Sequence, residues 1–195
     1  FHDDPRVLKA VDGWADEEVM HGRALAKWAE LADSSFNFDE SFKIFTDGFS
    51  LPLEAEQSVR GSRTGELIAR CMVETGTSSY YTALAGATDE PVLKAVCRKI
   101  AQDEFAHYNL FHRHMTRYMS LERLGAWGRF KVAIGRIAES EDDELAYAYY
   151  AANNSTQPYD RKTNASAYGK CAFGYYTPTI VRRGIGMMFH AIGLK

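Results

Sequence analysis

Two short segments of the chain pair a carboxylate with an imidazole. Glu18 and His21 form one Glu-x-x-His motif, and Glu104 and His107 form the other. Residues three apart lie on one face of an α-helix, so each motif can direct both side chains at a single point. A carboxylate oxygen together with an imidazole nitrogen suits iron, manganese or zinc. We therefore predict that the two motifs bind metal.

Apolar residues flank both motifs at helical spacing. Trp14 and Leu25 lie four residues to either side of the first motif, and Ile100 and Phe111 flank the second in the same way. This pattern places both motifs on the buried face of a helix. The alternative is that both are ordinary salt-bridged or surface pairs. Burial of an unpaired carboxylate costs several kcal/mol, so two of them in a core indicate that cations are supplied to meet them.

A third carboxylate, Glu74, falls in the inward row of another predicted helix, between Leu67 and Ser78. A surface carboxylate is the alternative, but the apolar and small residues along this row favour an inward position. The predicted metal ligands are therefore Glu18, His21, Glu74, Glu104 and His107.

The predicted fold is all-α, because alternating strand patterns are absent. Helices are expected from Val7 to about Leu31, from about Glu56 to Leu84, from about Pro91 to Met119, from about Phe130 to Ala152, and from about Ala165 to Leu194 with an interruption near Thr177-Pro178. The aromatic segment from Phe36 to about Glu54 contains Gly48 and Pro52, so we expect a loop with one or two short helical turns. The short turn before Pro91 predicts two antiparallel neighbouring helices.

Composition indicates one soluble globular domain. The chain is 46% hydrophobic and 25% charged, and its formal net charge is −3. It has no block of lysine and arginine, which argues against a nucleic-acid partner. No apolar run reaches the roughly eighteen residues of a membrane span. Cys71, Cys97 and Cys171 are odd in number and widely spaced, which favours reduced thiols and a cytoplasmic location.

The motif-bearing segments resemble a known family. The segment from Trp14 to Leu25 resembles the second ligand-bearing segment of soluble acyl-carrier-protein desaturases, which belong to the ferritin-like di-iron superfamily. The sequence around Glu74 and the segment from Ile100 to His107 resemble the third and fourth. The likeness covers about Phe1 to Met119.

This resemblance implies a ferritin-like four-helix bundle with additional C-terminal helices. The metal-binding bundle core would occupy residues 1–122 of a single domain spanning 1–195, with the further helices in 123–195. The opening helix and its Glu are not seen, because Phe1 begins too late to contain them, so we expect residues upstream of Phe1. The implied cofactors are two iron ions, although manganese can occupy the same ligands.

By the same resemblance, Thr77 matches a hydroxyl residue beside the oxygen-binding face of the metal site. The alternative is a helix threonine whose hydroxyl bonds back to its own backbone. The two interpretations remain open at this point.

The function implied is that of an oxygen-dependent di-iron oxidoreductase, desaturase-like or a hydroxylase, acting on a hydrophobic, acyl-type substrate. Its expected partners are a hydrophobic or acyl-carrier-bound substrate and an external electron donor, because the sequence shows no flavin, iron–sulfur or nicotinamide motif. The resemblance also implies a homodimer. Two alternatives are a ferritin-like metal-handling protein, either a ferroxidase or a peroxide scavenger, and a helical protein with an incomplete metal site.

Overall fold

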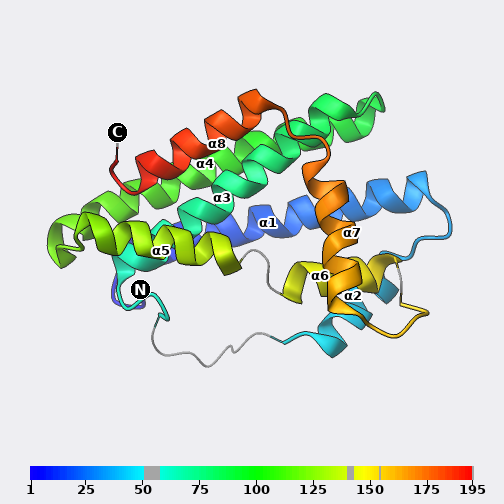
Figure 1. Cartoon of the computed structure of the whole chain (residues 1–195), viewed down its shortest axis with the longest axis horizontal. Helices are drawn as coiled ribbons and strands as arrows, with labels where there is room; N and C mark the ends of the chain where they lie inside the picture. The colour runs from blue at the N-terminus through cyan, green and yellow to red at the C-terminus, as the bar shows by residue number, and fades with distance from the viewer. Residues whose placement is uncertain (51–57, 140–142, 154, 195) are drawn as a thin grey trace.

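The computed structural model describes residues 1–50, 58–139, 143–153 and 155–194. The helices are α1 (Pro5–Ala32), α2 (Phe38–Gly48), α3 (Arg63–Ala87), α4 (Pro91–Glu122), α5 (Ala126–Glu139), α6 (Asp143–Asn153), α7 (Arg161–Phe173) and α8 (Pro178–Ala191) (Figure 1). No strand occurs in these ranges, which confirms the all-α prediction. Within the same ranges, no helix has the length and hydropathy needed to cross a membrane.

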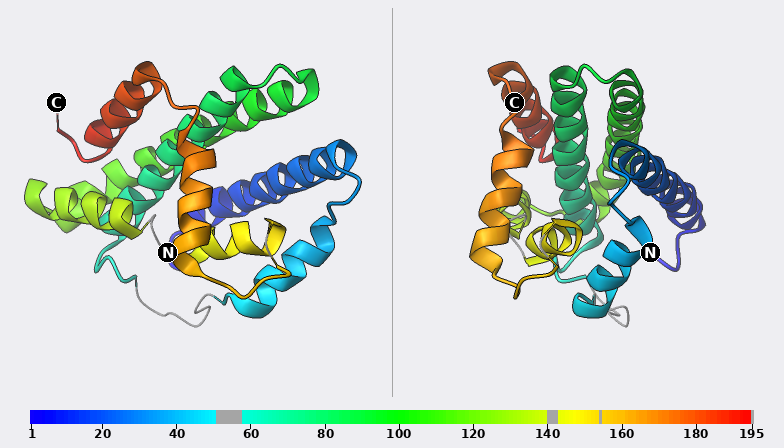
Figure 2. Two further views of the ribbon diagram at one scale, coloured as in Figure 1. Left: turned by 45° about the vertical axis from the view of Figure 1, so that its right-hand side comes forward. Right: turned by 90° about the vertical axis from the view of Figure 1, so that its right-hand side faces the viewer.

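The long helices α3 and α4 form a central antiparallel pair joined by a short turn (Figure 1). α1 packs against α4, whereas α8 packs against α3, so the pair separates α1 from α8 (Figure 2). α5 also contacts α3. The shorter helices α2, α6 and α7 pack on one another, with α6 in contact with both of the others. The central pair therefore provides the frame on which the candidate site is built.

Side-chain caps determine where several of these helices begin. The Asp4 carboxylate accepts from the Arg6 backbone N–H before α1, and the Glu90 carboxylate accepts from two N–H groups before α4. Each of these helices then has proline in its first turn, where a missing N–H costs nothing. α4 therefore begins at Pro91 as predicted, and α1 begins at Pro5, two residues before the expected Val7.

The start of α3 differs from the prediction. We expected this helix to begin near Glu56, whereas it begins at Arg63. Gly61 has φ +70°, a left-handed conformation that interrupts a helix, and the Ser62 side chain then caps α3 by accepting from the Gly65 N–H. Residues 51–57 lie outside the described ranges, so the expected first residues of this helix are not placed.

The prediction of a loop with short turns after Phe36 was wrong for residues 38–48, which form the eleven-residue helix α2. The Asn37 side chain accepts from the Glu40 N–H at its start, and Asp39 and Glu40 add negative charge where the helix dipole favours it. Gly48 ends the helix rather than preventing it.

The C-terminal part is divided more finely than predicted. The single helix expected from Phe130 to Ala152 is two helices, α5 and α6, and residues 140–142 between them lie outside the described ranges. The interruption expected near Thr177 is confirmed, because α7 ends at Phe173 and α8 begins at Pro178. Thr177 caps α8 through its hydroxyl, and Pro178 occupies the first helical position.

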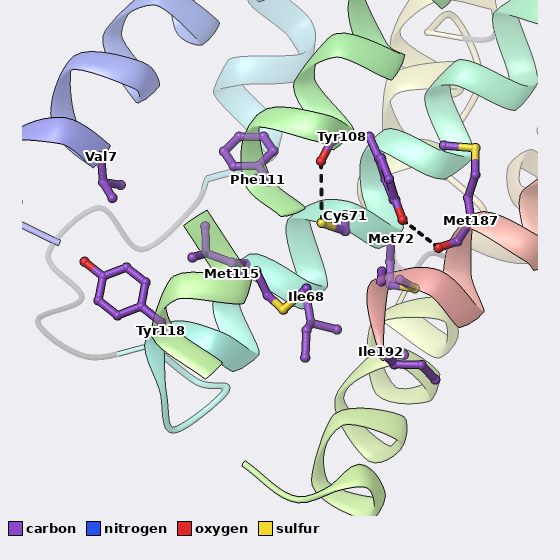
Figure 3. Close-up of a cluster of buried hydrophobic side chains, with 13 residues drawn as sticks. Val7, Ile68, Cys71, Met72, Tyr108, Phe111, Met115, Tyr118, Met187 and Ile192 are labelled. Atoms are coloured by element: carbon purple, nitrogen blue, oxygen red, sulfur yellow. Dashed lines mark hydrogen bonds between the residues drawn. The ribbon is translucent and has the colours of Figure 1, made fainter. Parts of the chain in front are cut away.

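A continuous apolar core joins α1, α3, α4 and the C-terminal end of the chain (Figure 3). Ile68 of α3 is fully buried and Met115 of α4 is 1% exposed. The buried Tyr108 hydroxyl donates to the backbone oxygen of Met187 at 2.8 Å, which ties α4 to α8. Gly184 permits the close approach of α8 to α3, since a Cβ there would lie 3.3 Å from the Ser79 hydroxyl.

Candidate metal centre

The structure brings all five predicted metal ligands together between α1, α3 and α4. One ligand atom from each of Glu18, Glu74, Glu104 and His107 lies within 4.8 Å of the others. His21 completes the group, because its Nδ1 atom lies 3.4 Å from Glu104 Oε1 and 3.7 Å from Glu18 Oε2. The buried cluster of carboxylates and imidazoles could hold a metal ion.

Two of the glutamates face both histidines. Glu18 Oε1 lies 3.3 Å from His107 Nδ1, while its Oε2 lies 3.7 Å from His21 Nδ1. Glu104 has the converse arrangement, with Oε1 3.4 Å from His21 Nδ1 and Oε2 3.9 Å from His107 Nδ1. Each of these two carboxylates therefore places one oxygen near each imidazole.

The two sides of the cluster are unequal. Glu74 Oε2 lies 3.6 Å from His107 Nδ1, so the His107 side has three carboxylates and one imidazole. Within the described ranges, the carboxylates near His21 Nδ1 are Glu18 and Glu104 alone. The His107 side therefore offers one more ligand than the His21 side.

A further acidic residue contacts the Nε2 atom of each imidazole. His21 Nε2 is 3.1 Å from Asp103 Oδ2, and His107 Nε2 is 2.6 Å from Glu17 Oε2. A carboxylate that accepts from the Nε2–H orients the ring so that Nδ1 faces the cluster, where its lone pair would be offered to a bound cation. These contacts connect the two motifs. Asp103, which precedes Glu104, orients His21, and Glu17, which precedes Glu18, orients His107.

Glu17 and Asp103 were not among the predicted site residues. Each directly precedes the ligand glutamate of its own motif, and this pairing of adjacent acidic residues was the available signal. Their positions one residue from the ligand place them beside the cluster rather than in it, which suits an orienting role.

The residues present fit a metal ion. The side chains of Glu74, Glu104 and His107 are no more than 4% exposed. The Nδ1 atoms of His21 and His107 and the Oε2 atom of Glu74 have no hydrogen-bond partner among the described residues. Buried polar atoms of this kind are costly, and a single kind of occupant, a cation, would satisfy all three. Carboxylates with imidazoles and no thiolate suit iron, manganese or zinc.

Charge balance supports the same conclusion. In the described part of the chain, Glu18, Glu74 and Glu104 form ion pairs with the two histidines and with no lysine or arginine. Burial raises the pKa of Glu74 well above its usual range. Burial alone would lower the pKa of His107, but Glu104, Glu18 and Glu74 raise it to about 12. Protons therefore take the place of cations in the metal-free cluster, and metal binding would release them.

Thr77 lies against the cluster. Its hydroxyl is 2.7 Å from Glu104 Oε2, compared with 3.2 Å and 3.3 Å from the backbone oxygens of Val73 and Glu74. A hydroxyl has one proton to donate, and the shortest contact is with the carboxylate. Thr77 also contributes, with His107, to the lowered pKa of Glu104, against the effect of burial. A catalytic role for Thr77 stays a prediction.

No protein-family model, curated protein or solved structure matches this chain. The all-α fold and the buried Glu/His cluster are thus the observations from which a function can be inferred, and they assign no family.

Replacing Asp103 by asparagine should weaken metal binding by about 10- to 100-fold, because outer-shell acceptors of this kind orient the ligand histidine and raise its basicity. Competition with a chromophoric chelator would measure the affinity. Lys99→Gln is the matched control, because Lys99 binds Asp103 from the solvent side and its loss leaves the bond between Asp103 and His21 in place. Equal affinities for the Asp103→Asn variant and the unchanged protein would rule out the orienting role.

Proposed function

We propose that the chain is an oxygen-dependent di-iron oxidoreductase, desaturase-like or a hydroxylase, that acts on a hydrophobic substrate. The observation that carries the proposal is the crosswise arrangement of the two motifs. Two imidazole nitrogens, each oriented by an outer carboxylate, face the same two shared glutamates, Glu18 and Glu104. An isolated structural ion would not require both carboxylates to be shared in this way.

The ligand set supports two ions rather than one. Glu18, Glu74 and Glu104 provide a charge of −3, which would nearly balance the +4 of two divalent ions. When bound, two redox-active ions would supply electrons for the reduction of dioxygen. The unequal ligand sets support tighter binding on the His107 side than on the His21 side.

The surroundings suit a reactive oxidant. Trp14, Ile100 and Phe111 each lie four residues from a cluster ligand on the same helix face, and Trp14 packs edge-on against Phe111 at 5.5 Å. Such apolar side chains limit the access of water to the part of the cluster that they border. The side chain of Glu18 is 36% exposed, in contrast to 2% for Glu74, so the cluster is most accessible on the α1 side. We propose that oxygen and substrate approach from there.

Oxygen uptake by the iron-loaded protein tests the proposal. With a chemical reductant present, a long-chain acyl compound or an isoprenoid compound should stimulate uptake, and the product should have lost two hydrogens or gained one oxygen atom. The Glu104→Gln variant should lose both the stimulated oxygen uptake and the formation of product. His112→Gln, which changes a histidine outside the cluster, should retain both.

Other outcomes would favour the alternatives. Oxygen uptake stimulated by ferrous iron alone, with no organic product, would identify a ferroxidase. A purified protein that binds no iron, manganese or zinc would indicate a helical protein with an incomplete site. Either result would refute the oxidoreductase proposal.

A further inference from the structure

A groove of about 400 Å³ lies on the central helix pair, separate from the metal centre. Its lining includes Ala85 and Gly86 of α3, Arg98, Ala101 and Phe105 of α4, and Arg183 of α8. None of the five predicted metal ligands contributes to it. Its volume falls within the range of roughly 300–1,000 Å³ typical of small-molecule sites.

Small residues make the groove hollow. Ala85 and Gly86 are adjacent on α3, and a Cβ built on Gly86 would meet no atom within 4 Å. On α4, residues 98, 101 and 105 recur at steps of three and four and thus share one helix face. Ala101, in the middle of that face, leaves space between the longer side chains of Arg98 and Phe105. The result is an apolar floor with a guanidinium group at its edge.

Arg183 is held in place by uncharged partners. Its Nη2 donates to the Ser78 hydroxyl at 2.9 Å, its Nη1 donates to the Thr82 hydroxyl at 3.2 Å, and its Cζ lies 5.6 Å from the centre of the Phe105 ring. A guanidinium has five N–H donors, so these two bonds leave others for a ligand. The side chain is therefore oriented in advance while its charge is not neutralised.

Neither arginine of the groove forms an ion pair within the described ranges. Elsewhere, Arg60, Arg63 and Arg117 each bind a carboxylate. The groove lining also contains no aspartate or glutamate. Two positive charges, Arg98 and Arg183, thus border one apolar hollow with no internal counter-charge.

We infer that this groove binds a small amphiphilic anion, with a carboxylate or phosphate head at Arg98 and Arg183 and an apolar body against Ala85, Ala101 and Phe105. Guanidinium groups suit both kinds of head, because a carboxylate or a phosphate can accept two parallel hydrogen bonds from one guanidinium. The apolar floor would contact the apolar body of such a ligand, and an inorganic anion has no such part. The inference is independent of the proposed oxidoreductase function, since it uses none of the metal ligands.

Isothermal titration calorimetry on the metal-free and the iron-loaded protein tests the site with four probes. Octyl phosphate and octanoate should bind, more weakly as salt concentration rises. Octanol and inorganic phosphate should each bind at least about tenfold more weakly, because each lacks one of the two required parts. Octanol binding as tightly as octanoate would overturn the role of the arginines. Inorganic phosphate binding as tightly as octyl phosphate would overturn the role of the apolar floor.

Variants locate the binding in the groove. Arg98→Gln and Arg183→Gln should each weaken binding of octyl phosphate about tenfold or more, the effect of losing a charge-assisted hydrogen bond. Arg182→Gln is the matched control, because it removes the same charge one residue away from a groove position.

Gly86→Leu provides a second, independent variant. It keeps both arginines and should abolish binding by filling the hollow, while metal content stays unchanged. This variant matters because Arg183 also anchors α8 to α3, so its replacement could disturb the fold. Unchanged affinity for octyl phosphate in folded Arg98→Gln and Gly86→Leu proteins would refute the site, whatever the metal centre does.

Discussion

Replacing Glu74 by glutamine should weaken metal binding at least about 100-fold, beyond the range for loss of an outer-shell partner, while making the metal-free protein more stable at alkaline pH. The substitution removes a ligand oxygen from the His107 side of the cluster. It also removes a carboxylate that is 1% exposed and lies next to Glu104. A site that holds like charges together for a cation is strained when the cation is absent.

The pH dependence has a definite sign. Burial raises the pKa of Glu74 above its ordinary value of 4.5 in the folded, metal-free protein. The folded state therefore keeps this proton to higher pH than the unfolded state does, and stability is lost as pH rises through the folded pKa. The Glu74→Gln variant lacks this loss, so its advantage in thermal stability should grow from mildly acidic to alkaline pH.

Thermal unfolding of metal-free protein across this pH range, together with chelator competition, measures both effects. Glu66→Gln is the matched control, because it changes the same residue type on the same helix outside the cluster. A Glu74→Gln protein that binds iron with unchanged affinity would contradict Glu74 as a ligand. A metal-free Glu74→Gln protein that is less stable than the unchanged protein at alkaline pH would contradict the idea that the buried carboxylate destabilises the metal-free cluster.

Shortening Ile68 to alanine should lower the free energy of unfolding by about 2–5 kcal/mol. Ile68 is fully buried in the core between α3, α4 and the end of the chain, where Met115 and Ile192 surround the same space (Figure 3). The cost combines lost apolar burial with a cavity that rigid neighbouring helices cannot close.

Denaturant unfolding monitored by circular dichroism gives this free energy. Ile185→Ala is the control, because it makes the same change on α8 at a position that is 46% exposed, where a loss of no more than about 1 kcal/mol is expected. Similar losses for the two variants would mean that the core does not have the packing described.

Local patterns in the sequence predicted most of the helices, and the convergence of the proposed ligands, where one face of a helix carries the signal. Glu18 and His21, and likewise Glu104 and His107, converge because helical geometry fixes their spacing and the apolar rows turn them inward. α2 was missed because Gly48 and Pro52 predict a break of the whole segment, whereas Gly48 is the last residue of a helix that Asn37 caps.

Other features depend on how helices far apart in sequence are aligned. The bond between His21 and Asp103 spans 82 positions and needs a particular register of α1 against α4, which no local pattern encodes. The same holds for the groove, where Arg183 meets Phe105 only because α8 returns to the central pair. The type of helical bundle stays a proposal for the same reason.

The candidate metal centre lies where α1 meets the central pair, and this position would affect the rate of metal release. α1 has its main neighbour in α4, and Glu18 and His21 contribute from α1 while Glu104 and His107 contribute from α4. Ions held here would join two helices that otherwise meet through side-chain packing and the bonds of Glu17 and Asp103. Because ligands of both helices would hold the ion, its escape would be coupled to local separation of α1 from α4. The residence time of the metal would then depend on the opening rate of a helix as well as on ligand exchange.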